Sequence, residues 1–107
     1  MTDALLVLTT VADRDKGVAL ARTLLERRLA ACVNVGAPVD SLYHWRGEIE
    51  TAQEVPLTIK TRASLYAKVE AAIRELHEYE LPEIVAVRIS DGFAPYIGWI
   101  VAEATGD

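Results

Sequence analysis

The sequence predicts a single α+β domain whose elements follow the order β-α-β-β-α-β-α. Its 107 residues are too few for a second domain of ordinary size. Segments with helical periodicity alternate with segments in which apolar side chains recur at every second residue. A hydrophobic content of 51% with 25% charged residues is typical of a globular chain and not of a disordered one.

The first third of the chain is expected to form a strand followed by a helix. Residues 4–11 (ALLVLTTV) are apolar on both alternating faces, which is typical of a strand buried on both sides. Asp13 or Asp15 can serve as the N-cap of the helix that follows. The apolar stripe of this helix is expected to consist of Val18, Ala21, Leu25 and Leu29.

The middle of the chain is expected to form one long hairpin. Residues 31–45 and 48–62 alternate in the manner of strands, and Arg46-Gly47 between them is a tight turn. Gly36-Ala37-Pro38 interrupts the first of these strands without clearly ending it. Because proline cannot donate a backbone hydrogen bond, we expect a bulge or an unpaired N–H at Pro56 in the second strand.

The remaining part is expected to begin with a helix and a strand. The stripe of this second helix is expected to consist of Leu65, Val69, Ala72, Ile73 and Leu76. Thr61 or Ser64 can cap it, and Pro82 is expected to stop it near Tyr79, because the residue before a proline avoids the helical conformation. Residues 84–89 then predict a strand.

These first six elements match the ferredoxin-like split βαβ arrangement, in which two helices cover one face of an antiparallel sheet. Pro95 indicates the start of an additional short helix at the C-terminus. We therefore expect residues 1–107 to form one ferredoxin-like domain with a long hairpin between its second and third strands.

The hairpin is longer than the helices can cover. A helix of about 15 residues is about 23 Å long and covers about seven strand residues, whereas each hairpin strand offers about twice that number. Leu42, Tyr43, Trp45 and Ile49 therefore lie beyond the reach of either helix. Exposed aromatic side chains and open strand edges favour association, so we expect burial against another copy of the chain. The alternative is a ribbon that folds back on its own sheet.

Charge and composition exclude several classes of protein. Eleven Lys and Arg against sixteen Asp and Glu give a net charge of −5, so the basic surface of a nucleic-acid-binding protein is not expected. No apolar run approaches the roughly 18 residues of a membrane span, and the N-terminus lacks the basic region of a secretory signal. The only cysteine, Cys32, cannot form an internal disulfide, which suits the cytoplasm.

The candidate chemical residues are few and lie far apart in the sequence. His77 precedes Glu78 at the expected end of the second helix, where the helix dipole alone can account for a histidine. Cys32 lies in an apolar strand, where a small buried side chain is the simpler role. A thiolate and an imidazole would favour copper or zinc only if the fold or an oligomer brought them together. Lys60 lies in an otherwise apolar strand, and a pair with Glu83 would satisfy both side chains, as structure or as the floor of a ligand pocket. Glu48, Glu50 and Glu54 on the second hairpin strand are expected to be mostly solvated.

The sequence contains no local pattern that indicates catalysis. No metal-binding spacing, no Ser-His-Asp or Cys-His set in a supporting context and no phosphate-binding loop occurs. We therefore do not expect an enzyme. The tryptophans are interpreted as packing or interface residues and not as platforms for nucleic-acid bases, because the chain is acidic.

Several separated motifs resemble the CutA family of divalent-cation tolerance proteins. They occur in order and span essentially the whole chain: residues 29–34 (LAACVN), 41–49 (SLYHWRGEI), 54–61 (EVPLTIKT), 77–84 (HEYELPEI) and 96–99 (YIGW). The resemblance implies a ferredoxin-like fold and a homotrimer held together through the long hairpin, with an architecture similar to that of PII signalling proteins. It also implies a role in divalent-cation tolerance and the binding of copper or another divalent metal, without catalysis or an organic cofactor.

The resemblance also implies site residues. By position, Cys32 and His77 match candidate metal ligands of the family. Trp45, Lys60, Tyr79 and Glu83 match motif positions that form a ligand pocket or a subunit interface. An alternative that the resemblance leaves open is a PII-like regulatory module, which would bind a small anionic metabolite or a partner protein in the clefts between subunits, with Lys60 as the anion contact.

The chain departs from the family pattern at the implied metal site. Thr9 stands where some relatives have cysteine, and Leu76 stands where some have a second histidine. Glu78 replaces the proline that commonly follows the histidine. Because two soft ligands are missing, we expect copper binding to be weak or to use Cys32, His77 and nearby carboxylates.

Overall fold

The computed structural model describes residues 2–107 and confirms the predicted α+β fold. Its elements, in chain order, are β1 (Ala4–Val11), α1 (Arg14–Glu26), β2 (Cys32–Val35), β3 (Val39–Trp45), β4 (Glu48–Arg62), a 3₁₀ turn η1 (Ala63–Leu65), α2 (Tyr66–Leu76), β5 (Val85–Arg88) and α3 (Ala94–Glu103). Within the described residues, no helix is both long and apolar enough to cross a membrane.

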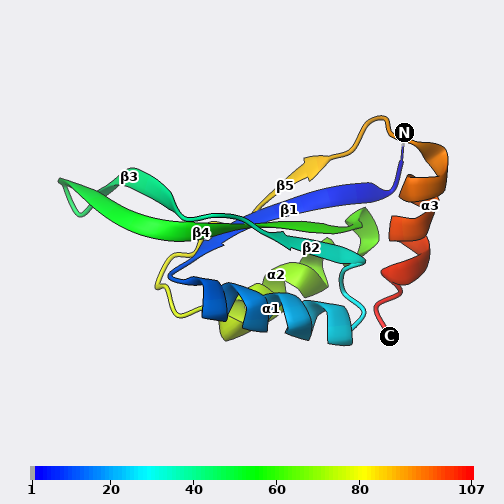
Figure 1. Cartoon of the computed structure of the whole chain (residues 1–107), viewed down its shortest axis with the longest axis horizontal. Helices are drawn as coiled ribbons and strands as arrows, with labels where there is room; N and C mark the ends of the chain where they lie inside the picture. The colour runs from blue at the N-terminus through cyan, green and yellow to red at the C-terminus, as the bar shows by residue number, and fades with distance from the viewer. Residues whose placement is uncertain (1) are drawn as a thin grey trace.

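The sheet has the strand order β2-β4-β1-β5, and every neighbouring pair is antiparallel. Helices α1 and α2 cover one face of this sheet, and α3 lies at the end where β1 begins (Figure 1). Side chains of alternate residues on β1 and β4, such as Val7 and Ile59, are fully buried against the helical layer, together with Leu24 and Ile73. The predicted position of two helices on one face is confirmed.

Helix α1 presents a stripe that matches the prediction only in part: Ala21 is buried, as is Leu29 just after the helix ends, but the other buried positions differ. Asp13 caps it, with a carboxylate oxygen that accepts a hydrogen bond of 2.9 Å from the Lys16 N–H. Its buried residues are Gly17, Leu20, Ala21 and Leu24, whereas Leu25 is 39% exposed. At Gly17 the helix approaches the sheet so closely that a Cβ atom would lie 3.2 Å from the Val11 side chain. This close approach turns the glycine face toward the sheet and Leu25 toward solvent.

Helix α2 begins and ends differently from the prediction. No side chain caps it, because the chain enters it through the 3₁₀ turn and the Thr61 hydroxyl donates instead to the Leu29 carbonyl at 2.7 Å. The helix ends at Leu76 and not near Tyr79. His77 already has extended backbone angles, and it leads into the loop that connects α2 with β5, residues 77–84.

Strand β3 and the outer half of β4 form an arm that extends beyond the helices (Figure 1). Arg46 and Gly47 both have positive φ, 51° and 82°, as expected for the type I′ turn of a two-residue hairpin. The chain measures 44 × 26 × 23 Å, and its radius of gyration of 14.3 Å exceeds the roughly 13 Å of a compact chain of this length. The prediction that the hairpin outruns the helical layer is confirmed.

Pro56 is accommodated by a bulge on the opposite strand. Val35 of β2 pairs with Leu57, but Val39 of β3 pairs with Glu54. The three residues 36–38 therefore lie opposite only two residues of β4, 55 and 56. Pro56 lies opposite this bulge, and its carbonyl accepts a hydrogen bond of 2.9 Å from the Gly36 N–H. The expectation of a bulge is therefore correct, but the extra residue lies in segment 36–38 and not in β4.

The bulge exchanges the two faces of the ribbon. Before it, Val35 shares the helix-covered face with Leu57. After it, odd-numbered residues such as Tyr43 and Trp45 share the opposite face with Glu54, because side chains alternate along a strand. One extra residue thus decides which side chains of β3 lie beside the open face of the sheet.

Candidate functional site

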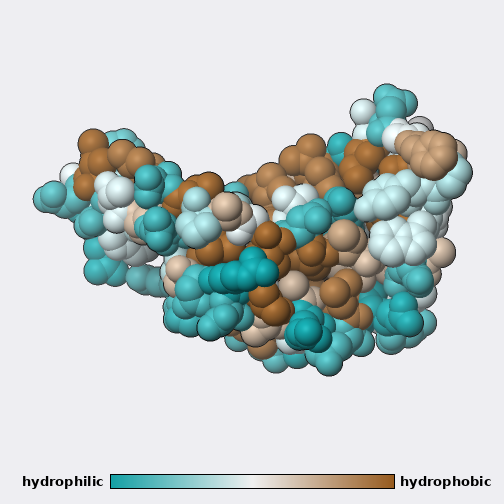
Figure 2. All heavy atoms as spheres, viewed as in Figure 1, coloured by the Kyte–Doolittle hydropathy of each residue, from teal (hydrophilic) through white to brown (hydrophobic). Residues whose placement is uncertain are grey.

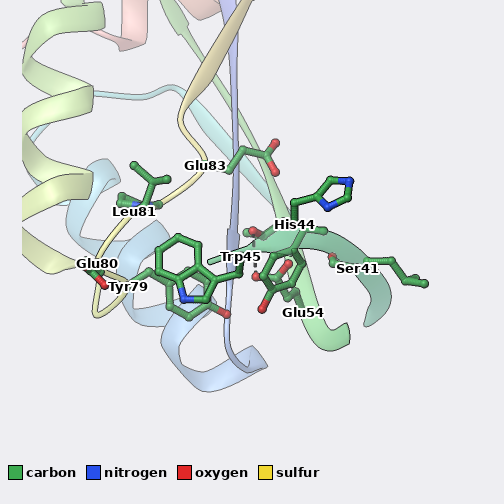
Figure 3. A pocket seen from close by; sticks show the side chains of 12 residues that line it. Ser41, His44, Trp45, Glu54, Tyr79, Glu80, Leu81 and Glu83 are labelled. Carbon is green, nitrogen blue, oxygen red and sulfur yellow. Dashed lines mark hydrogen bonds between the residues drawn. The ribbon is translucent and has the colours of Figure 1, made fainter. Parts of the chain in front are cut away.

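A cavity of about 720 Å³ lies between the arm and the α2–β5 loop. We call it the arm cavity. Its lining side chains include Thr10, Tyr43, Trp45, Glu54, Tyr79 and Glu83, contributed by β1, β3, β4 and the α2–β5 loop (Figure 3). A pocket of this size is in the range that binds small molecules.

Glu54 is the most enclosed polar group of the arm cavity. The residue is only 9% exposed, although the sequence favoured solvation for Glu48, Glu50 and Glu54 alike. One of its carboxylate oxygens accepts a hydrogen bond of 3.2 Å from the Thr10 hydroxyl. The expectation of a solvated Glu54 is wrong, because the β1–β4 pairing brings Thr10 beside it at the point where the arm leaves the sheet.

Tyr79 forms the opposite wall and interacts with the same carboxylate. Burial raises the pKa of its phenol to about 12, and a hydrogen bond to Glu54 and the negative charge of Glu54 act in the same direction. The phenol therefore remains protonated at neutral pH. Glu54 thus lies between a hydroxyl of β1, which donates to it, and the phenol of the α2–β5 loop, whose pKa it raises.

His77 fixes the loop that carries Tyr79. Its Nε2 lies 2.6 Å from the Thr10 carbonyl oxygen, which can only accept, so this nitrogen carries the proton. Its Nδ1 then accepts a hydrogen bond of 3.1 Å from the Tyr79 N–H. The two rings are tilted against each other with centroids 4.5 Å apart. Both ring nitrogens of His77 are therefore engaged with backbone groups.

The predicted metal ligands do not meet within one chain. In the sheet, Cys32 of β2 lies opposite Lys60 of β4, which lies opposite Leu6 of β1. His77 instead bonds to the carbonyl of Thr10, four residues after Leu6 on β1. At about 3.3 Å per residue and about 4.8 Å per strand, these positions are roughly 13 Å apart along the sheet and roughly 10 Å apart across it. Among residues 2–107, no group of three His, Cys, Asp or Glu side chains could hold a metal ion.

The two residues that replace implied metal ligands, Thr9 and Leu76, supply no ligand of their own. Thr9 is 1% exposed and its hydroxyl has no hydrogen-bond partner in the described chain. A neutral hydroxyl is a poor substitute for a thiolate toward a soft metal. Leu76 is 44% exposed and apolar. The residues of a single chain therefore do not fit a copper site.

Lys60 lies in a second cluster, on the face of the sheet that α1 and α2 leave open. Its Nζ donates to the Tyr96 hydroxyl at 3.2 Å and lies 5.5 Å from the centroid of the same ring. Tyr96 in turn stacks on Trp99, with centroids 5.5 Å apart. The predicted ion pair between Lys60 and Glu83 is wrong, because Glu83 lines the arm cavity instead.

The open face of the sheet is apolar and unusually exposed. Leu6 and Leu8 of β1 are each partly exposed there, and their partners Val87 and Val85 on β5 are 50% and 47% exposed. Figure 2 shows the corresponding apolar surface over β5. On the arm, Leu42 and Ile49 are 69% and 71% exposed and belong to adjacent pairs on one face of the ribbon.

The structure thus separates the predicted site residues into two groups. Trp45, Tyr79 and Glu83 line the arm cavity, and His77 secures its loop. Cys32 and Lys60 lie together on the open face of the sheet. The sequence did not indicate three further lining residues, Thr10, Tyr43 and Glu54. The one available signal was that Glu54 and Pro56 flank Val55, the first buried apolar residue of β4.

Comparison with known families gives one consistent match. Residues 5–103 match the family described as CutA1 divalent ion tolerance protein. The chain is 40% identical over 100 residues to the divalent-cation tolerance protein CutA of Thermus thermophilus, which covers 94% of this chain and 96% of the relative. It spans about half the length of the relatives from Arabidopsis thaliana and Homo sapiens, 53% and 50%.

Solved structures agree with the observed fold. The crystal structure of CutA from Xylella fastidiosa superimposes with a TM-score of 0.93 at 39% identity, over 96% of this chain and 99% of that one. A structure from Archaeoglobus fulgidus, described as a periplasmic divalent cation tolerance protein CutA, has a TM-score of 0.91 at 33% identity, over 94% and 98% of the two chains.

Proposed function

Because the chain belongs to the CutA1 divalent ion tolerance family, we propose that it functions in divalent-cation tolerance as a homotrimer, without catalytic turnover. The observation that carries the assembly is the apolar open face of the sheet, where Val85 and Val87 are about half exposed. An uncovered apolar face with an open strand edge is a typical interface between subunits. The arm, which carries Leu42 and Ile49 away from the helical layer, supplies a second contact surface.

The assembly can be tested with a charged residue on the open face. Light scattering should give the wild-type chain about three times its mass of 11.7 kDa. Val87→Lys should lower this mass, because the lysine would have to be desolvated at the interface. Leu25→Lys is the matched control, since Leu25 is 39% exposed on the outer face of α1. A monomeric wild type, or the same mass for both variants, would contradict the proposal.

We further propose that the trimer binds copper or another divalent cation weakly. The supporting argument is the donor chemistry of Cys32 and His77, of which a trimer offers three copies each. To bind a metal, His77 would have to release the Tyr79 N–H from its Nδ1. The ligand set is not assembled within one chain, so we derive no step from a bound metal. Calorimetric titration of copper should show binding that Cys32→Ser and His77→Gln each reduce. Curves identical to the wild type would remove the residue concerned from the site.

No observation favours the PII-like alternative with an anionic metabolite. The arm cavity contains three glutamates among its lining residues and, in the described chain, no lysine or arginine. Lys60, the expected anion contact, is bound to Tyr96 on the open face. The cytoplasmic location expected from the single cysteine remains part of the proposal, and cell fractionation tests it.

A further inference from the structure

The arm cavity is negatively charged. Glu54, Glu80 and Glu83 line it, and only Glu80 is neutralised by an ion pair, with a guanidinium nitrogen of Arg46 at 3.2 Å. Within residues 2–107, Glu54 and Glu83 form no ion pair. The charge that remains raises the local concentration of cations and opposes the entry of anions.

Aromatic rings form much of the remaining wall. Tyr43 and Trp45 come from β3, on the face that the bulge turns toward Glu54, and Tyr79 comes from the α2–β5 loop. Figure 3 shows Trp45, Tyr79 and Glu54 among the side chains that line the cavity. The face of an aromatic ring carries partial negative charge and attracts ammonium and guanidinium groups. The walls and the carboxylates therefore favour the same kind of ligand.

One cationic side chain of the protein, that of Arg46, already makes both kinds of contact at the rim of the cavity. The Arg46 guanidinium lies 5.4 Å from the centroid of the Trp45 ring and is paired at the same time with Glu80. The Arg46 side chain is 72% exposed, so water weakens both interactions there. Further from the tip of the arm, Tyr79 lies near both Tyr43 and Glu54, and Glu54 is 9% exposed. Attraction to this carboxylate is less screened.

We propose that the arm cavity binds a small organic cation, with an ammonium or guanidinium group against the aromatic rings and Glu54. A ligand with an apolar body fits the volume of about 720 Å³. A bare metal ion fits less well, because the described residues offer no cluster of three suitable ligands. This binding site goes beyond the proposed function and does not depend on a metal.

The test compares a cation with its uncharged isostere. Choline and 3,3-dimethylbutan-1-ol have nearly the same shape, and only choline carries a charge. Calorimetric titration into the wild-type protein should give choline a dissociation constant of about 1 mM or lower. The alcohol should bind at least about 10-fold more weakly, since the cation–π and carboxylate interactions are lost. Equal binding of the two compounds, or no binding of choline at about 10 mM, would overturn the proposal.

Variants locate the binding in the cavity. Glu54→Gln keeps the shape of the side chain and should weaken choline binding about 10-fold, and Trp45→Leu should weaken it similarly. Glu83→Gln, at an exposed position, should cost about 3-fold and covers the case in which the Glu54 variant fails to fold. Glu26→Gln, at an exposed position on α1, and Trp99→Leu, both outside the cavity, should bind as the wild type does. Equal losses in these two controls would refute the assignment.

The experiments can refute the cation site and the trimer independently of each other. A trimer that does not bind choline refutes the cation site alone, because the mass is measured without the ligand. If the wild type is a monomer that binds choline, and Glu54→Gln weakens this binding, only the trimer is refuted.

Discussion

A single carboxylate, that of Glu54, joins two segments that are distant in sequence. The Thr10 hydroxyl donates to it, and its negative charge acts on the nearby Tyr79 phenol, so strand β1 and the α2–β5 loop both meet it where the arm leaves the sheet. His77 adds two hydrogen bonds between the same loop and β1. These contacts connect residues that only the folded chain brings together, and their loss can be measured one side chain at a time.

Tyr79 should make stability sensitive to alkaline pH. Its pKa is about 12 in the folded protein, above the ordinary value of 10.0, so the folded state keeps a proton that the unfolded state releases. The contribution is complete below about pH 10 and is lost as the pH rises toward 12, by about 1–2 kcal/mol. Urea unfolding between pH 9 and about 12 should show this loss in the wild type and a smaller one in Tyr79→Phe. Parallel curves would contradict the assignment.

His77→Ala should destabilise the fold through lost hydrogen bonds and not through lost charge. The substitution leaves the Tyr79 N–H and the Thr10 carbonyl without their partner, which should lower the free energy of unfolding by about 1–3 kcal/mol. His44→Ala is the matched control, because His44 is exposed on the arm and should change little. Equal denaturation midpoints for the two variants would show that the His77 hydrogen bonds contribute nothing measurable.

At the scale of elements, the segment 36–38 has more influence than its length suggests. The extra residue opposite Pro56 moves the odd-numbered side chains of β3 to the face of the ribbon that Glu54 occupies. Tyr43 and Trp45 therefore share a ribbon face with Glu54 because of this bulge.

Gly36→Ala should disturb this junction. A Cβ atom at residue 36 would lie 2.9 Å from the Pro56 ring and 3.3 Å from the Pro56 carbonyl oxygen, so the strands would have to separate. We expect a loss of about 1–3 kcal/mol in the free energy of unfolding. Gly98→Ala, in helix α3 with nothing within 4 Å, should be neutral or stabilise by up to about 1 kcal/mol. A smaller loss at Gly36 than at Gly98 would contradict this account of the bulge.

The sequence was sufficient for the elements and insufficient for their contacts. The alternation in residues 4–11 and 55–61 and the turn at Arg46-Gly47 predicted the strands, because local periodicity and turn chemistry determine them. The burial of Glu54 could not be predicted, since it depends on Thr10 and Tyr79, which lie 44 and 25 positions away. The buried face of α1 was missed for a similar reason. It is set by the approach of Gly17 to Val11.

At the scale of the whole molecule, the open face exposes apolar side chains to water, which is unfavourable for a single chain. Helices cover one side of the sheet, and β5 is exposed along its whole length on the other side. If another copy of the chain covers this face, both the mass in solution and the thermal stability of the protein should depend on the assembly.

The thermal midpoint of the wild type should rise with protein concentration. A partner that binds only the folded chain stabilises it by mass action, so dilution should lower the midpoint. Val87→Lys should show a lower midpoint that no longer varies with concentration, whereas Leu25→Lys should vary as the wild type does. Calorimetric scans over a hundredfold dilution measure this directly. A wild-type midpoint independent of concentration would contradict assembly through this face.

The bulge also constrains how this gene can change. Substitutions in segment 36–38 alter side chains, but removal of one residue there would restore an uninterrupted register. Tyr43 and Trp45 would then rotate to the other surface of the ribbon, and Leu42 and His44 would take their places. Insertions and deletions before the arm should therefore be selected against, while changes of length at its tip should be tolerated. Among homologous sequences, the spacing between Val35 and Val39 should vary less than the residues within it.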